Sequence, residues 1–359
     1  MRVAIFHDYF GAIGGGENVV LMMADALDAD IITTDMDAVA LIAGDRNVLS
    51  VGSTVKIAPF KQISAAARFA TCDFSEDYDF FIFSGNWAHY AARRHHPNLW
   101  YCHILIGAMK DENIPFCDYS GRFARGFYRC GSGFHRSLDR RSMANVDRIL
   151  ANSQNTRAQI LRYYGRDADI LYPAVDVSRY VHREAGDYWL SVNRLYPEKR
   201  IELQIDAFRR MPEERLIIVG GHAAADHSSP YIRWLNEDLP ENVTILGEVP
   251  FDELVDLYSR SRGLICTSFN EPFGITPLEA MASGKPVVAV KSGGFLETVT
   301  RETGKLVDPD PANIVTAVRE IMNDPEAYRL PCLQRARLFD VSVFSERIRE
   351  VVYQAYQEM

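Results

Sequence analysis

Short apolar runs alternate with longer amphipathic stretches along the whole chain, and the runs are rich in Val, Ile and Phe. Runs of about four residues that are each followed by a polar or glycine-bearing loop are typical of buried strands. The expected strands are, in the first half, residues 3–6, 31–33, 80–83, 99–102 and 149–151 and, in the second half, residues 189–192, 216–219, 243–246, 264–266 and 287–290. Because helical stretches separate them throughout, the pattern predicts an α/β protein with doubly wound parallel sheets.

The length of the chain indicates two domains. With 359 residues, of which 47% are hydrophobic, the chain can bury more than one core. We place the linker near residues 172–176, between the two sets of strands. The expected domains are therefore residues 1–172 and 173–342, each Rossmann-like, followed by a last helix with one apolar face at about 343–356.

Composition excludes several classes of protein. A net charge of −9 argues against a nucleic acid as partner, because a phosphate backbone requires a basic surface. No apolar run reaches the ~18 to 20 residues that a membrane span requires, and no signal peptide precedes the first strand, so we expect a cytoplasmic protein. The cysteines lack CxxC or metal-ligand spacing and are expected to be reduced structural thiols; they are Cys72, Cys102, Cys117, Cys130, Cys266 and Cys332.

The richest motif lies between two of the expected strands of the second half, at residues 271–279. Pro277 suits the first turn of a helix, so we expect the helix to begin near Thr276 and to leave the preceding backbone N–H groups ready to bind a phosphate. Glu271 lies in the loop before this anion site and Glu279 about two turns beyond it. Each glutamate taken alone is more often a solvated surface residue. Inside a βαβ unit, at the carboxyl end of a strand, the two carboxylates instead predict a site for a nucleotide sugar.

Two further loops follow strands and carry candidate residues. Gly14, Gly15 and Gly16 allow a close approach to a ligand, and their spacing differs from the dinucleotide fingerprint GxGxxG; a flexible surface loop is the alternative.

Arg194 and Lys199 flank a proline, and although both residue types are usually solvated, two cations at this position can neutralise a leaving diphosphate.

Most of the chain resembles the retaining glycosyltransferases of family 4, which have the GT-B fold. The segments that carry the resemblance are residues 271–284, 293–297, 191–199, 151–153 and 172–176. The likeness is closest to bacterial polysaccharide mannosyltransferases. It implies that the last helix, residues 343–359, crosses back onto the first domain.

The resemblance also implies roles for particular residues. The donor site would include Gly15, Gly16, Arg194, Lys199, Val249, Phe273, Gly274, Ile275, Thr276 and Glu279, with the base near the loop 247–250. His103 and Glu271 would contact the sugar, and Asp8 or Tyr9 would face the acceptor. An isolated histidine is more often a core or surface residue. The residues after His103, 104–107, depart from the Thr-Pro-Met-Arg continuation of related mannosyltransferases, which leaves the acceptor pocket and the sugar open.

The expected reaction is a retaining, metal-independent hexosyl transfer without a cofactor. No Asp-x-Asp metal motif lies at the strand ends, since Asp308-Pro-Asp310 reads as a turn. GDP-mannose is the favoured donor and a UDP-hexose the alternative. The alternatives to a glycosyltransferase are a GT-B-like epimerase or phosphorylase and a non-catalytic sugar-nucleotide sensor.

A basic and aromatic segment, residues 120–141, reverses the acidic character of the chain. Such a surface can adsorb to anionic lipid headgroups, which would bring the protein to a lipid-linked acceptor at the inner face of the plasma membrane. Aromatic residues packed on the core of an ordinary helix and loop are the alternative.

Overall fold

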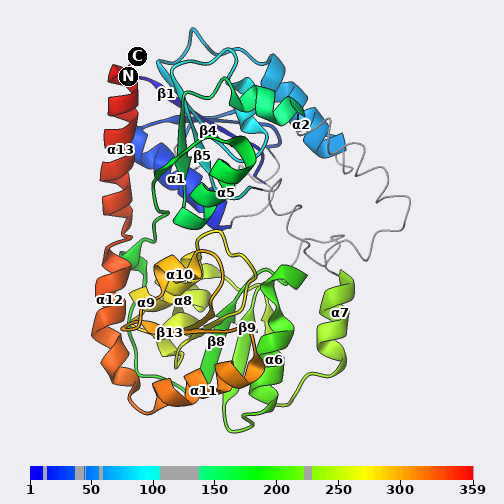
Figure 1. Cartoon of the computed structure of the whole chain (residues 1–359), viewed down its shortest axis with the longest axis vertical. Helices are drawn as coiled ribbons and strands as arrows, with labels where there is room; N and C mark the ends of the chain where they lie inside the picture. The colour runs from blue at the N-terminus through cyan, green and yellow to red at the C-terminus, as the bar shows by residue number, and fades with distance from the viewer. Residues whose placement is uncertain are drawn as a thin grey trace. The chain divides into compact units, whose positions relative to one another are not determined.

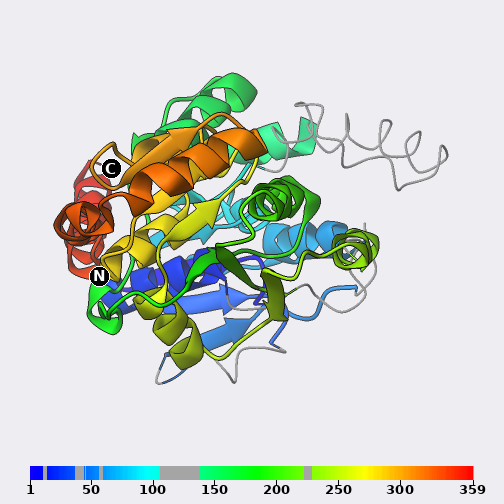
Figure 2. The same cartoon turned by 90° about the horizontal axis from the view of Figure 1, so that it is seen from below.

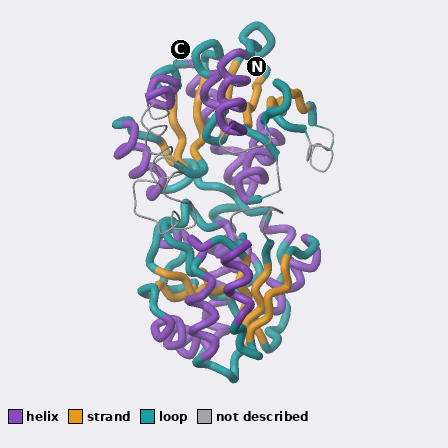
Figure 3. Tube along the Cα trace, turned by 90° about the vertical axis from the view of Figure 1, so that its right-hand side faces the viewer, coloured by secondary structure: helices purple, strands orange, loops and turns teal. Residues whose placement is uncertain are grey.

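The computed structural model describes residues 1–10, 14–36, 44, 46–55, 60–105, 137–221 and 229–358. The chain divides into two compact units, which are described separately: unit 1 comprises residues 1–173 and 342–359, and unit 2 comprises residues 174–341. Figure 3 shows the strands of each unit flanked by helices. The division falls inside the segment that the sequence indicates as the linker.

Unit 1 contains a sheet of parallel strands in the order β3-β2-β1-β4-β5-β6-β7. Its strands are β1 (Val3–His7), β2 (Asp30–Thr33), β3 (Val48–Ser50), β4 (Phe80–Ser84), β5 (Asn98–Cys102), β6 (Arg148–Ala151) and β7 (Asp169–Ile170). Its helices are α1 (Gly15–Leu27), α2 (Phe60–Thr71), α5 (Gln154–Tyr164), α13 (Val341–Gln357) and the 3-10 helix η2 (Ala88–Ala91), together with helical residues 137–143. The central strands β1, β4 and β5 are buried along their whole length, because helices cover both faces of the sheet.

The last helix, α13, packs in unit 1 (Figure 1). Arg349 Nε donates a 2.7 Å hydrogen bond to the carbonyl oxygen of Ala26 at the end of α1. The ring of Phe344 meets the ring of Tyr101 from β5 edge-on, with centroids 6.5 Å apart. The apolar face that the sequence indicates is therefore buried against this unit.

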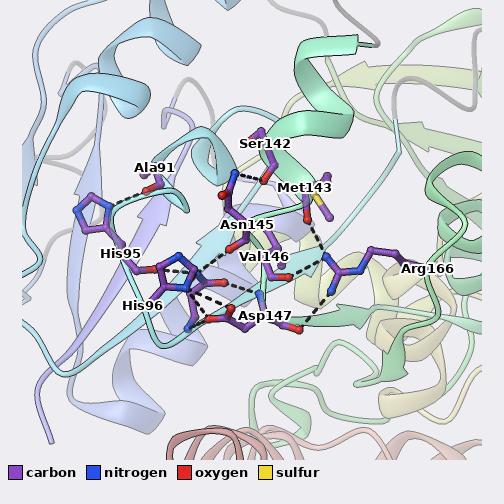
Figure 4. Close-up of polar contacts among 10 residues, drawn as sticks. Ala91, His95, His96, Ser142, Met143, Asn145, Val146, Asp147 and Arg166 are labelled. Atoms are coloured by element: carbon purple, nitrogen blue, oxygen red, sulfur yellow. Dashed lines mark hydrogen bonds and ion pairs between the residues drawn. The ribbon is translucent and has the colours of Figure 1, made fainter. Parts of the chain in front are cut away.

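A polar network holds the amino-terminal edge of the same sheet (Figure 4). The Asp147 carboxylate lies 2.9 Å from His96 Nδ1. Arg166 donates to the carbonyl oxygens of Met143, the last of helical residues 137–143, and of Val146 just beyond them, at 2.7 and 2.8 Å. Ligands in open α/β sheets bind at the opposite, carboxyl edge, so we assign this network a structural role.

Unit 2 contains a second parallel sheet in the order β10-β9-β8-β11-β12-β13. Figure 1 labels β8, β9 and β13 of this sheet, and Figure 2 gives a view of the same chain from below. Its strands are β8 (Tyr188–Val192), β9 (Arg215–Val219), β10 (Val243–Gly247), β11 (Leu264–Cys266), β12 (Val287–Val290) and β13 (Gly304–Val307). Its α-helices are α6 (Ile201–Arg209), α7 (Ser229–Glu237), α8 (Phe251–Arg260), α9 (Ile275–Ala282), α10 (Phe295–Thr298), α11 (Pro311–Met322) and α12 (Arg329–Arg337). Its 3-10 helices are η4 (Val177–Arg179), η5 (Pro197–Lys199) and η6 (Pro325–Tyr328). One face of the sheet forms a core with α6, α7 and α11.

All the strands expected from the sequence are confirmed to within one or two residues. The sequence analysis missed β3, β7 and β13, which are three of the four edge strands of the two sheets; the fourth, β10, was expected. Edge strands are covered on fewer sides, and these three contain exposed or half-buried positions that break the apolar runs. A short apolar run therefore identified every central strand but only one of the four edge strands.

Other features bear on the composition arguments. Among the helices of the described ranges, none is both long and apolar enough to cross a membrane. Cys72, Cys102, Cys266 and Cys332 are free thiols, while residues 117 and 130 lie outside the described ranges. Asp308-Pro-Asp310 leads into α11, where the Asp310 carboxylate caps the helix by accepting from the N–H of Ala312.

Candidate active site

The order of strands indicates where each unit can bind a ligand. In unit 1 the order reverses between β1 and β4, and in unit 2 it reverses between β8 and β11. The loops that leave two neighbouring parallel strands diverge at such a point and open a crevice at the carboxyl edge of the sheet. The candidate residues of both units lie on these loops, in the helices that follow them or at neighbouring strand ends.

In unit 2 an ion pair joins the two loops at the reversal point. Lys199, from the loop after β8, places Nζ 2.8 Å from Oε2 of Glu271, from the loop after β11. The side chains remain 22% and 16% exposed, so each is partly desolvated and still accessible. The sequence analysis named both residues without predicting that they contact each other.

Hydrogen bonds fix the backbone beneath this pair. The hydroxyl of Thr267, just after β11, donates to the carbonyl oxygen of Lys199 at 2.7 Å. The guanidinium of Arg200 donates to the carbonyl oxygens of Thr267 and Ser268 at 2.8 and 3.3 Å. Since each loop donates hydrogen bonds to the backbone of the other, the positions of Lys199 and Glu271 do not depend on their own ion pair alone.

The amino terminus of α9 follows directly after Glu271. Gly274 caps the helix with a φ of 92°, a conformation that residues with a Cβ rarely adopt. The loop after β12 supports this turn, because the N–H of Gly294 donates to the carbonyl oxygen of Glu271 at 2.7 Å. Gly293 has a φ of 59°, and a Cβ there would lie 2.2 Å from the same oxygen. The helix begins at Ile275, one residue before the expected start, and the predicted anion-binding residues 273–276 form its cap and first turn.

Glu279 lies farther along α9 and is half-buried. One of its carboxylate oxygens accepts a 2.7 Å hydrogen bond from the hydroxyl of Tyr258 in α8, and the hydroxyl of Tyr180 is a second donor. Burial raises the pKa of Glu279, while the two tyrosine hydroxyls oppose the rise. The sequence analysis missed both tyrosines, because they lie far from Glu279 in the chain and belong to no motif.

The remaining candidates of unit 2 occupy neighbouring strand ends. Arg194 is exposed in the loop after β8, and among the described residues no ion pair involves it. Val249 is half-buried in the loop between β10 and α8. Gly220, at the end of β9, joins that loop through a 2.8 Å bond from its N–H to the carbonyl oxygen of Gly247. The expected donor residues of unit 2 therefore share the carboxyl edge of one sheet.

In unit 1 the glycine loop differs from expectation. Gly15 and Gly16 form the first turn of α1 rather than a loop before it, and Gly14 is the N-cap. The Glu17 carboxylate accepts from the N–H of Gly14 at 3.0 Å, which stabilises the start of the helix. Residues 11–13 lie outside the described ranges. Because both glycines lie in the first turn of α1, their backbone N–H groups have no partner within the helix and can bind a ligand.

His103 lies just beyond the end of β5. Its Nε2 is 2.8 Å from the hydroxyl of Ser84, and the same hydroxyl is 3.2 Å from Nδ1 of His7. Burial lowers the pKa of His103 to about 3, with a smaller contribution from His7. Burial likewise lowers the pKa of His7 to about 4. Both imidazoles are therefore neutral at physiological pH, and the sequence analysis missed His7 and Ser84.

The Asp8 carboxylate is buried within unit 1. Both of its carboxylate oxygens accept from backbone N–H groups, those of Asn86, Trp87 and Ala88, at 2.7 to 2.8 Å. Burial raises the pKa of Asp8 to about 6, and the three N–H groups oppose the rise. The side chain thus anchors the start of η2. Of the two acceptor candidates we keep only the half-buried Tyr9, whose ring lies 3.6 Å below Nζ of Lys61.

The chemistry available at these edges is electrostatic. A lysine, helix-terminal N–H groups and carboxylates can bind a diphosphate and sugar hydroxyls. In the described part of the chain, no three His, Cys, Asp or Glu side chains gather as a metal-ligand group. Of the basic segment 120–141, only residues 137–141 lie inside the described ranges.

Known proteins resemble this chain over most of its length. Residues 13–179 match the family model described as Glycosyltransferase Family 4, and residues 177–337 match the model described as Glycosyl transferases group 1. The alpha-1,3/1,6-mannosyltransferase of Homo sapiens is 28% identical over 298 residues, which are 73% of this chain and 68% of that protein. The O-antigen chain mannosyltransferase RfbU of Salmonella typhimurium is 30% identical over 200 residues, which are 54% of this chain and 56% of that protein. The chain thus spans about half to two thirds of the length of these relatives.

Solved structures establish the fold. The sucrose-phosphate synthase of Thermosynechococcus elongatus has a TM-score of 0.82 at 19% identity and matches all of both chains. HepE of Anabaena, solved in complex with UDP, has a TM-score of 0.76 at 19% identity and covers 99% of this chain. Since the two family models together extend over residues 13–337, the chain belongs to the family 4 (group 1) glycosyltransferases and has the GT-B fold.

Proposed function

We propose that the protein transfers a hexose, mannose from GDP-mannose, to a glycan or lipid-linked acceptor with retention of the anomeric configuration. The observation that carries this proposal is the Lys199–Glu271 pair, which lies at the strand-order reversal of unit 2, directly before the amino terminus of α9. This edge combines a cation, helix-terminal N–H groups and a carboxylate, the groups that a nucleotide sugar requires.

The cationic groups act on the leaving diphosphate. Negative charge grows on the diphosphate as the glycosidic bond breaks, so Lys199, Arg194 and the first-turn N–H groups of α9 stabilise the transition state more than the bound donor. We propose that these groups take the place of a divalent metal ion. Lys199 serves Glu271 and the diphosphate together, since a lysine ammonium has three N–H donors.

The carboxylates orient the donor. Glu271 accepts from hydroxyls of the sugar. Glu279, whose Oε2 accepts from Tyr258, also accepts from the ribose hydroxyls. His103 orients the sugar or the attacking hydroxyl, and Tyr9 faces the acceptor. The transfer proceeds by front-face attack through an oxocarbenium-like pair, so that positioning rather than a covalent intermediate decides the stereochemical outcome.

Mannose is favoured by the relatives, two of which are named as mannosyltransferases. A UDP-hexose is the second candidate donor, favoured by the complexes of HepE with UDP and with UDP-glucose. The test incubates the protein with GDP-mannose, UDP-glucose and UDP-galactose and measures the release of GDP or UDP. Lys199→Ala should lower the rate of release about a hundredfold. Lys305→Ala is the matched control, because Lys305 on the edge strand β13 of the same unit forms a comparable 2.7 Å pair with Glu320. Absence of release with every donor, from well-folded protein, would refute the proposal.

We further propose that the protein works in the cytoplasm against the inner face of the plasma membrane, through residues 120–141. Each cation near an anionic surface contributes about 1 kcal/mol. Co-sedimentation with vesicles, with and without anionic lipid and at two salt concentrations, tests this. Equal recovery without vesicles, with neutral vesicles and with anionic vesicles would indicate a soluble acceptor.

A further inference from the structure

Three polar side chains form a line across the carboxyl edge of unit 1. His7 ends β1, Ser84 ends β4 and His103 follows β5, and these strands are neighbours in the sheet. In the parallel register His7 pairs with Ser84, so the line lies at the point where the strand order reverses. Ser84 is fully buried and His7 is 6% exposed, so water does not compete for their hydrogen bonds.

The hydroxyl of Ser84 connects the two imidazoles and carries a single hydrogen. It lies 2.8 Å from His103 Nε2 and 3.2 Å from His7 Nδ1. If the hydroxyl donates to one ring nitrogen, it can satisfy the other only by accepting an N–H from it. Two arrangements therefore place the hydroxyl hydrogen between the rings, and they give His103 opposite tautomers.

The surroundings of the other ring nitrogen of His103 decide between them. A Cβ built on Gly16 would lie 3.8 Å from His103 Nδ1, so this nitrogen lies beside the first turn of α1. The N–H groups of that turn carry partial positive charge, which favours a lone pair at Nδ1 over an N–H. The nearby Glu17 carboxylate is occupied by the N–H of Gly14 and does not reverse this preference.

We propose that Ser84 and His7 are positioning residues that hold His103 as its Nε2–H tautomer. His103 Nε2–H donates to Ser84, and Ser84 donates to His7 Nδ1. The Nδ1 of His103 is then an acceptor that faces the α1 side. We expect this nitrogen to accept a hydrogen bond from a hydroxyl of the donor sugar or of the acceptor substrate, and this expectation rests on the function proposed above. The assignment of the tautomer does not depend on that function.

Hydrogen-bond partners commonly set the tautomer and the orientation of a functional histidine. The peptide at His103 is fixed separately, since Asn152 Nδ2 donates to the His103 carbonyl oxygen at 2.7 Å. The ring of Tyr101 also packs edge-on against the ring of His103, with centroids 4.8 Å apart. Removal of the Ser84 hydroxyl should therefore change the proton position on the ring more than the place of the ring.

The test labels the histidines with ¹⁵N and records ring nitrogen shifts, with His103→Gln used to assign the signals. In the wild type, His103 Nδ1 should have the shift of an unprotonated nitrogen. Ser84→Ala should move His103 towards a mixture of tautomers and lower kcat about tenfold or more, the scale seen when partners of functional histidines are lost. Donor affinity should not change, and Ser84→Thr, which keeps the hydroxyl, should restore the spectrum and kcat.

His7→Asn provides a second variant, because its side-chain oxygen can still accept from Ser84 and should preserve the His103 tautomer. His7→Phe cannot accept and should disturb it. A wild-type spectrum with Nδ1 protonated, or an unchanged His103 signal in both Ser84→Ala and His7→Phe, would overturn the proposal. If Ser84→Ala does not fold, the two His7 variants decide. If no donor supports turnover and the spectra still change as expected, the proposed function fails and the tautomer assignment stands.

Discussion

Acid should destabilise unit 1 through His7, and the size of the effect follows from the pKa of this residue. Burial lowers the pKa of His7 from 6.5 to about 4 in the folded protein. Below pH 6.5, the pKa of His7 in the unfolded chain, the unfolded chain binds a proton at His7 and the folded chain does not. The free energy of unfolding therefore falls as the pH falls from 6.5 towards 4. The slope for one proton is about 1.4 kcal/mol per pH unit, which gives a loss of roughly 2 kcal/mol at about pH 5.

The assay is hydrogen exchange of the β1 amides, which reports on unit 1 without assuming that both units unfold together. Exchange is corrected for its intrinsic pH dependence and measured at about pH 7 and about pH 5. His7→Asn cannot titrate and should lose the part of the pH dependence that His7 causes. His96→Asn removes an exposed histidine from the same unit and should leave that dependence in place. Wild-type and His7→Asn proteins with the same difference between the two pH values would refute the reasoning.

Three further outcomes are expected. Lys199→Ala and Glu271→Gln should each lower kcat about a hundredfold, since a lost transition-state contact costs ~3 kcal/mol, with little change in Tm; wild-type turnover would remove that residue from the site. Gly293→Ala should destabilise unit 2 and weaken donor binding, because the added Cβ would lie 2.2 Å from the carbonyl oxygen of Glu271. The control Gly165→Ala has a similar φ and no atom within 4 Å of the added Cβ, so it should lower the free energy of unfolding by only about 1 kcal/mol. Equal losses of unfolding free energy for the two variants in urea would contradict this. GDP or UDP should raise Tm equally in EDTA and in magnesium, and a strict requirement for a divalent ion would exclude the metal-independent mechanism.

The local pattern of the sequence determined the fold class and the central strands. Val3–His7, Phe80–Ser84 and Val287–Val290 are buried on both faces, and a strand in that environment must be apolar at nearly every position. The helix start near Pro277 was also predictable, since the fixed φ of proline acts locally. Edge strands such as Val48–Ser50 were not, because partial exposure removes the apolar run.

The candidate residues were named from motifs, whereas their contacts depend on the tertiary structure. Lys199 and Glu271 are 72 residues apart and meet because β8 and β11 are neighbours at the strand-order reversal. In the same way, His7 and Ser84 are 77 residues apart and share a hydrogen bond because β1 and β4 are neighbours. No local pattern in the sequence predicts this bond. Asp8 shows the converse: the family resemblance implied that Asp8 or Tyr9 faces the acceptor, whereas three backbone N–H groups about 80 residues away bind the Asp8 carboxylate. Residue type and spacing report on the local chain, while the partner of a polar side chain is decided by which strands the sheet places side by side.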